Sequence, residues 1–184
     1  MEPTTEFKLT KTAIPGLLII DINLMEDHRG YFQEKFQKEK LVAAGFPKDF
    51  SIVQQNISYN KLTATMRGIH AEPWDKYISV IKGKIFAAFI DLRDGENFAQ
   101  KVEVELDHTK AVFVPRGVGN SYQTLVDDCY YQYFVNAHWR GGERYVGVNL
   151  FDPDLKIAWP ISKDKVIVSE KDKKLPLLKQ IQPF

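Results

Sequence analysis

Short apolar runs separated by turn residues are the feature that most limits how this chain can fold. The runs are rich in β-branched and aromatic side chains, which favours strands over helices. We expect strands at Leu17–Ile20, Ile52–Val53, Tyr77–Ile81, Ile85–Leu92, Val102–Leu106 and Ala111–Val114. Many short strands joined by turns predict an all-β fold, a β-sandwich or barrel of the jelly-roll kind.

Helical patterns are confined to two short stretches. One covers about Gln37–Ala44 and stops at Gly45, a residue that commonly ends helices. The other covers about Glu170–Gln180 and is broken or started by Pro176, because proline lacks the N–H that a helix interior requires. The sequence therefore predicts a jelly roll with a few short helices.

Length and charge limit the class of protein. A chain of 184 residues is long enough for one domain with its own core. We expect a single domain over residues 1–184, with a jelly-roll core at about 15–160 and a C-terminal helical segment at about 161–184. The 25 basic and 24 acidic residues form no basic stripe, which argues against nucleic-acid binding. We find no run of membrane-spanning length and no signal-peptide pattern, so we expect no membrane partner and a cytoplasmic location.

Metal ligands are sparse and dispersed. The histidines form no His-x-His pair, and the residue two positions after His70 is Glu72. Asn120 stands in a later turn where a ligand histidine could have been. The single cysteine, Cys129, cannot form an internal disulfide or a cysteine metal cluster. We therefore expect no metal.

The stretch Arg67–Lys76 carries residue types suited to metal-free acid–base chemistry. It brings His70 and Lys76 next to the expected strand Tyr77–Ile81. A base and a cation on one pocket wall suit proton abstraction beside a carbonyl, because the developing enolate oxygen needs a positive charge. These residues are equally compatible with a surface loop that carries a solvated lysine and a packed histidine.

Tyrosines in a later strand add a possible proton donor. In Tyr130–Tyr133, alternation places Tyr131 and Tyr133 on one face and Tyr130 on the other. A tyrosine that points into a barrel can donate a proton. More often such a tyrosine belongs to the core with its hydroxyl group hydrogen-bonded.

Several short motifs occur in a fixed order along nearly the whole chain. They are Asp27–Glu34, Val53–Ser58, Met66–His70, Phe113–Gly117, Asp152-Pro153, Ile157–Pro160 and Ser169–Asp172. Together they resemble the dTDP-4-dehydrorhamnose 3,5-epimerase family, whose members are dimeric jelly-roll enzymes of the cupin type. The form from His70 to Lys76, with Asn120 after it, is similar to a subgroup found in some Gram-positive bacteria.

The resemblance implies an isomerase of nucleotide sugars. The family converts dTDP-4-dehydro-6-deoxy-D-glucose to dTDP-4-dehydro-L-rhamnose, in dTDP-rhamnose biosynthesis, by inverting C3 and C5 without metal or cofactor. Its catalytic base matches His70, and the carboxylate that partners the base matches Asp172. Its proton-donating tyrosine matches Tyr133, and its lysine beside the keto oxygen matches Lys76.

The resemblance also implies a substrate-binding set. Trp139 falls where the family places an aromatic ring against the thymine. The remaining positions of this set are Arg29, Glu34, Gln54, Asn56, Arg67 and Asn120. Asn120 departs from the family, because many members carry a histidine there. Asparagine can donate a hydrogen bond but cannot exchange a proton at neutral pH, so the number of inverted carbons is left open.

Two alternatives remain beside a double epimerase. One is a C3-only epimerase or a ketoisomerase acting on a related nucleotide sugar. The other is a sugar-binding cupin without catalysis. The resemblance further implies a homodimer, in which an exposed edge strand at Leu17–Ile20 would add to the sheet of a second copy and Arg29 would reach the partner's groove.

Overall fold

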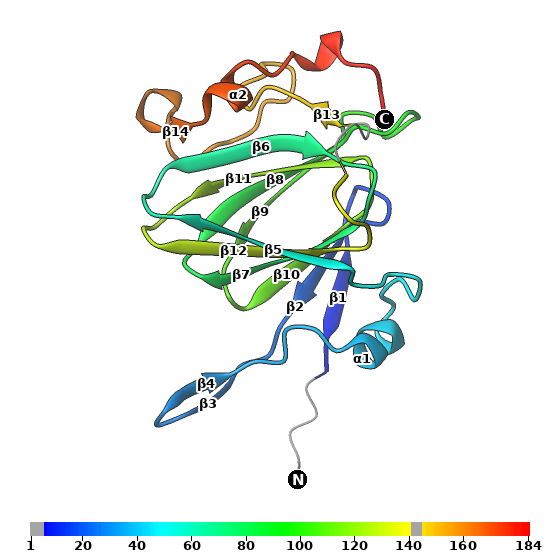
Figure 1. Cartoon of the computed structure of the whole chain (residues 1–184), viewed down its shortest axis with the longest axis vertical. Coiled ribbons are helices and arrows are strands. Elements are labelled where there is room, and N and C mark those ends of the chain that lie inside the picture. Colours follow the sequence, from blue (N-terminus) through cyan, green and yellow to red (C-terminus); the bar gives the residue numbers. More distant parts are fainter. Residues whose placement is uncertain (1–5, 141–144) are drawn as a thin grey trace.

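The computed structural model describes residues 6–140 and 145–184, and in it two antiparallel sheets face each other (Figure 1). The first sheet contains, in spatial order, β1 (Lys8–Lys11), β2 (Leu18–Asp21), β10 (Lys110–Val114), β7 (Lys76–Lys82), β12 (Cys129–Val135) and β5 (Gln54–Asn60). The second contains β13 (Val146–Gly147), β6 (Thr65–Ala71), β11 (Val118–Thr124), β8 (Ile85–Asp91) and β9 (Lys101–Leu106). A short strand, β14 (Ile167–Val168), pairs with β6 in parallel. The prediction of an all-β jelly roll is confirmed.

The smaller elements lie outside the two sheets. A hairpin of β3 (Met25–Asp27) and β4 (Gly30–Phe32) extends away from the barrel, and we call it the arm (Figure 1). The helical elements of the described residues are α1 (Lys38–Ala43), α2 (Glu170–Lys173) and the 3₁₀ turns Lys163–Lys165 and Leu178–Gln180. None of the helices in the described ranges is long and apolar enough to cross a membrane.

Apolar side chains fill the space between the sheets and cover both outer faces. The inner cluster joins β7 to β8 through residues such as Ile78, Val80 and Phe89, all buried. On the outer face of the first sheet, Phe46 and Phe50 pack against β7 and β10 in the segment that follows α1. The C-terminal segment covers the outer face of the second sheet, and lies along β6 in Figure 1. Burial of these faces is the main driving force for the two-sheet arrangement.

Most of the expected strands are present, but the strand at Ile52–Val53 is a wrong prediction. These two residues precede β5 and are 41% and 42% exposed. The strand itself begins at Gln54 and alternates half-buried polar residues with exposed ones. A search for apolar runs misses such a strand, because its half-buried positions carry the polar residues Gln54, Asn56 and Ser58.

The two helix predictions had different outcomes. The first is confirmed as α1, where the side chain of Gln37 caps the helix by accepting from the N–H of Lys40 at 2.7 Å. The second is wrong in extent. Helix α2 ends at Lys173, and a separate 3₁₀ turn follows only after Pro176, whose ring and missing N–H prevent one continuous helix.

The predicted edge strand is also wrong. Strand β2 lies between β1 and β10, so the backbone of Leu18–Asp21 is paired on both sides. Leu17 and Ile20 are fully buried. The edges of this sheet are β1 and β5 instead. Any addition of a second copy to this sheet would therefore take place at one of those strands.

Strand β6 contains an irregularity that determines which of its side chains face inward. His70 pairs with Asn120 and Arg67 pairs with Tyr122, with a register shift between the two pairs. Regular alternation would put residues three apart on opposite faces. The shift places His70 and Arg67 on the same inner face, as expected for a β-bulge.

Gly68 makes this bulge possible. Its φ of +107° is a conformation that other residues rarely adopt. A Cβ atom at Gly68 would lie 2.6 Å from the carbonyl oxygen of Asn120 and 2.7 Å from Cβ of Ser121. Strands β6 and β11 therefore approach each other too closely for any side chain at this position.

We predict that Gly68→Ala lowers the free energy of unfolding by about 2–4 kcal/mol, because backbone strain and overlap with β11 add together. Gly95→Ala is the matched control. Gly95 also has a positive φ, +130°, but a Cβ atom there would meet no atom within 4 Å. Only backbone strain therefore applies, and we expect the free energy of unfolding to fall by about 1 kcal/mol. Urea unfolding of both variants measures the difference. Equal losses would contradict the close approach at Gly68.

Candidate active site

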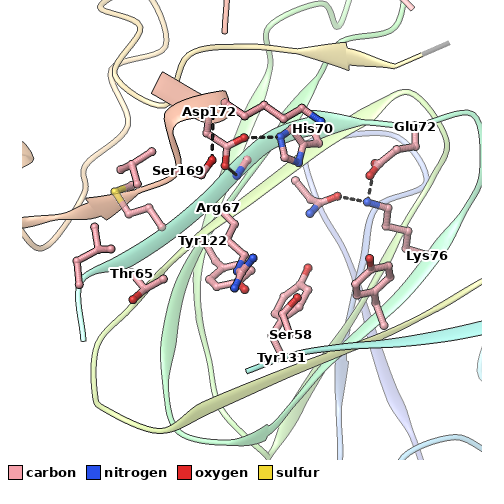
Figure 2. Close-up of a pocket in the computed structure, with 17 residues that line it drawn as sticks. Ser58, Thr65, Arg67, His70, Glu72, Lys76, Tyr122, Tyr131, Ser169 and Asp172 are labelled. Atoms are coloured by element: carbon pink, nitrogen blue, oxygen red, sulfur yellow. Dashed lines mark hydrogen bonds and ion pairs between the residues drawn. The ribbon is translucent and has the colours of Figure 1, made fainter. Parts of the chain in front are cut away.

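A pocket of about 520 Å³ opens between the two sheets beside the C-terminal segment (Figure 2). This volume is in the range typical of small-molecule sites. Six residues of the predicted site line it together: Arg67, His70, Lys76, Asn120, Tyr133 and Asp172. They come from β6, β7, β11, β12 and α2, so the site depends on strands of both sheets.

The histidine and the carboxylate of the predicted pair are in contact. Nε2 of His70 lies 2.9 Å from Oδ1 of Asp172, across 102 residues of sequence. If Nε2 carries the hydrogen and donates to Asp172, the other ring nitrogen, Nδ1, is left as an acceptor. His70 and Asp172 therefore have the arrangement of an oriented base.

The C-terminal segment holds Asp172 in place. The side chain of Ser169 caps α2 by accepting from the N–H of Asp172 at 3.1 Å, and the N–H of Gly68 donates to Oδ2 of Asp172 at 3.4 Å. Burial acts to raise the pKa of Asp172, but its hydrogen bonds, above all that from His70, outweigh burial and lower the pKa below 3.8. Asp172 is therefore a carboxylate at neutral pH.

Lys76 is a buried cation on the opposite side of the pocket, next to Glu72 (Figure 2). Its Nζ lies 2.5 Å from Oε2 of Glu72 and donates to Oδ1 of Asn120 at 2.6 Å. Burial lowers the pKa of Lys76, whereas the charge of Glu72 and its hydrogen bond act to raise it. The lysine lies on the face of β7 that also carries Ile78 and Val80, which explains its burial.

Three tyrosines form the wall between these groups. The rings of Tyr122 and Tyr131 stack at a centroid distance of 4.4 Å, and Tyr133 lies 5.9 Å from Tyr131. Tyr130 lies on the other face of β12 and is 38% exposed, which confirms the predicted alternation. Burial, and then the charge of Glu72, raises the pKa of Tyr133, while Arg67 acts in the opposite direction. Tyr133 therefore keeps its proton at neutral pH.

Arg67 has a fixed position in the pocket. Its Nε donates to Oδ1 of Asn60 at 3.0 Å, and the hydroxyl group of Tyr122 donates to the same oxygen at 3.2 Å. Since Asn60 is buried at the end of β5, it links Arg67 to the first sheet. A held guanidinium group of this kind can bind anionic oxygens of a ligand.

Five predicted substrate-binding residues lie outside this pocket: Arg29, Glu34, Gln54, Asn56 and Trp139. Arg29 is on the arm, where it forms an exposed ion pair with Asp27, and Glu34 pairs with Lys40 near α1. Asn56 is the closest to the site, because it pairs with Tyr133 between β5 and β12. Trp139 is 62% exposed, and its backbone N–H donates to the side chain of Gln54 at 3.1 Å.

Comparison with known proteins identifies the family of this chain. The family model of dTDP-4-dehydrorhamnose 3,5-epimerase matches residues 11–180. The chain belongs to this family. A relative from Streptococcus pyogenes, named protein RmlC homolog, is 45% identical over 177 residues, which cover 93% of this chain and 89% of the relative. A dTDP-4-dehydrorhamnose 3,5-epimerase from Methanothermobacter thermautotrophicus is 32% identical over 91% of this chain and 92% of its own length.

A solved structure supports the same assignment. The structure of RmlC from Streptococcus suis in complex with dTDP-D-xylose superposes with a TM-score of 0.91 at 42% identity, over 97% of this chain and 94% of that chain. The family match to residues 11–180 includes Asp172. Fold and family therefore agree with the motifs in the sequence.

Several pocket residues were not predicted from the sequence. The sequence was used only to note that Glu72 stands where a second histidine ligand would have been. Its spacing of four residues from Lys76 could have suggested an ion pair. Ser58 on β5 pairs with Tyr131 on β12, and both line the pocket. If β5 had been recognised as a strand, its alternation would have placed Ser58 on the inner face. Tyr131 was expected on the same face as Tyr133, and the remaining polar lining residues that were missed are Thr65, Tyr122, Ser169 and Lys171.

The described residues contain no cluster of three or more His, Cys, Asp or Glu side chains placed to hold a metal ion. Cys129 is fully buried in the inner cluster, as expected for a packing thiol. The ionisable groups that line the pocket are an imidazole, a guanidinium, two ammonium groups, three phenols and two carboxyl groups.

Proposed function

We propose that this chain is a dTDP-4-dehydrorhamnose 3,5-epimerase, which converts dTDP-4-dehydro-6-deoxy-D-glucose to dTDP-4-dehydro-L-rhamnose in dTDP-rhamnose biosynthesis. The observation that carries the proposal is the contact between His70 and Asp172 in the same pocket as Lys76 and Tyr133, within a chain of this family. Fold alone would not support a function, but an assembled set of acid–base groups does.

His70 is the proposed base. A C–H bond next to the C4 ketone breaks, the proton moves to Nδ1 of His70, and the electron pair is delocalised onto the C4 oxygen as an enolate. The bond from Nε2 to Asp172 fixes the ring and stabilises the imidazolium that forms. Imidazole suits this role because it ordinarily titrates near neutral pH.

Lys76 is the proposed stabiliser of the enolate. Its ammonium group lies in a buried part of the pocket, where a positive charge interacts with a developing negative charge more strongly than in water. Arg67 is proposed to bind the diphosphate or sugar oxygens, as a held guanidinium can.

Tyr133 is the proposed proton donor. Inversion requires that the new proton reach the carbon from the face opposite to His70, and Tyr133 belongs to the other sheet. Its raised pKa keeps the phenol protonated until the enolate accepts the proton. C3 and C5 both flank C4, so the same base and acid serve both carbons after a small shift of the sugar, once His70 has released its proton to water and Tyr133 has regained one from water.

Solvent exchange tests these roles. In heavy water with the 4-keto sugar, we predict that His70→Asn lowers deuterium uptake at C3 and C5 by at least about 10²-fold, since a general base contributes on this order. Tyr133→Phe is expected to retain exchange but to lose the inverted product. Tyr130→Phe, which changes the exposed face of the same strand, serves as the matched control with normal exchange and product.

Other outcomes of the same experiment discriminate the alternatives. Undiminished exchange in His70→Asn would remove this residue as the base, and unchanged product from Tyr133→Phe would remove the donor. NMR of the product that shows inversion at C3 alone, or a moved carbonyl, would identify a C3-only epimerase or a ketoisomerase. A non-catalytic binder would give no exchange at all.

We further propose a homodimer in which each arm reaches the pocket of the partner. Arg29 lies on the arm, which projects away from its own barrel, and Tyr31 and Phe32 are 51% and 64% exposed (Figure 1). Exposed aromatic side chains on a projecting hairpin are typical of a contact surface. The arrangement would bring Arg29 to a site that it cannot reach in its own subunit. A single domain over 1–184 and a cytoplasmic location are part of the same proposal.

Mixing two inactive variants tests this arrangement. We predict that Arg29→Ala and His70→Asn are each strongly impaired, and that joint refolding restores activity. One site of each mixed dimer would then combine an intact His70 with an intact Arg29, so random pairing restores about a quarter of the sites. Sedimentation measures the dimer. A monomer, or no recovery on mixing, would contradict the exchange of arms.

A further inference from the structure

Glu72 is a carboxylate inside the pocket to which the reaction described above gives no role. It follows β6 directly, and its side chain is only 11% exposed. Oε2 lies 2.5 Å from Nζ of Lys76, whose side chain is 6% exposed. Two opposite charges this well removed from water are retained together, because either one alone would be costly to bury.

The contacts of Lys76 leave one donor for a ligand. An ammonium group has three N–H donors and no acceptor. One is donated to Oδ1 of Asn120 at 2.6 Å, and on another side the ammonium forms an ion pair with Oε2 of Glu72, which has no hydrogen bond of regular geometry among the described residues. Since an ammonium can only donate, the contact with Asn120 also fixes the oxygen of that amide toward Lys76. The third N–H is the one that remains for an oxygen atom of the substrate.

We propose that Glu72 is a positioning residue, which keeps Lys76 charged and directs its remaining N–H toward the keto oxygen of the sugar. The proposal rests on the function proposed above and assigns a role to a residue that does not itself exchange a proton with the substrate. A neutral lysine at this position would have a lone pair directed at the enolate and no charge to stabilise it.

The other ionisable groups of the pocket do not replace Glu72. Asp172, on α2, is bonded to His70, and Arg67 on β6 adds positive charge rather than compensating it. On β12, the ring of Tyr133 has its centroid 5.5 Å from Nζ of Lys76. Tyr122 on β11, Tyr131 on β12 and Lys171 on α2 complete this set. Burial lowers the pKa of Lys76 and Glu72 opposes this change, so removal of the carboxylate must lower the pKa further.

Glu72→Gln removes the charge with little change in shape. We expect the protonation midpoint of Lys76 to fall by about 1–3 pH units, the effect of an opposite charge within a few ångströms. ¹⁵N NMR of the lysine Nζ atoms in the free protein measures this midpoint, and the signal absent from Lys76→Met identifies the residue. The alkaline limit of solvent exchange at C3 should move to lower pH in the same variant.

Two controls separate this effect from others. Glu72→Asp retains the charge, and its Lys76 midpoint should stay close to that of the unchanged protein. Glu105→Gln removes the partner of Lys84 in an exposed pair outside the pocket, and neither measurement should change. Measurement on Lys76 itself is needed because Glu72 also raises the pKa of Tyr133, so the exchange profile alone could reflect the tyrosine.

The two possible failures are distinguishable. Exchange by the unchanged protein, together with a Lys76 midpoint that Glu72→Gln does not lower, would overturn the role of Glu72 alone. Absence of exchange by the unchanged protein at every pH would overturn the proposed function and this role with it. A lower protonation midpoint of Lys76 in Glu72→Gln, together with an alkaline limit of exchange at lower pH, supports both the proposed function and the role of Glu72.

Discussion

The register shift between β6 and β11 is the constraint on which the pocket depends. Without it, regular alternation would direct either Arg67 or His70 to the outer face, where the C-terminal segment packs. With it, both face inward. The same approach of the two strands brings the N–H of Gly68 to Asp172, so the bulge also helps to hold the carboxylate that orients His70. One local departure from regular strand geometry thus helps to place His70, Asp172 and Arg67 in the pocket.

Much of the fold could be predicted from the sequence, because its central strands are apolar on at least one face. Tyr77–Ile81 and Ile85–Leu92 are recognisable for this reason and correspond to β7 and β8. Strand β5 was placed two residues early and β6 was not recognised, because they carry polar side chains at positions that face inward, such as Ser58, Arg67 and His70. Polar residues that line the pocket therefore weaken the hydrophobic pattern of the strands that carry them.

The candidate site was predicted in part through the family resemblance. His70, Lys76, Tyr133 and Asp172 meet in one pocket, although sequence spacing alone could not have brought Asp172 next to His70 across 102 residues. Arg29, which the resemblance assigned to the groove of a partner subunit, lies outside this pocket on the exposed arm. The partnership of Lys76 with Glu72 was missed because it depends on how the stretch after β6 folds, which no pattern in those residues specifies.

We propose that this pocket epimerises a dTDP-linked 4-keto-6-deoxy sugar. The most direct measurement couples the purified protein to a rhamnose-forming reductase, with dTDP-4-dehydro-6-deoxy-D-glucose as substrate and NMR of the nucleotide sugar that accumulates. We predict that dTDP-L-rhamnose accumulates, with both C3 and C5 inverted. None should form when the protein is omitted. Recovery of the sugar with both centres unchanged, under conditions in which the reductase is active on authentic intermediate, would contradict it.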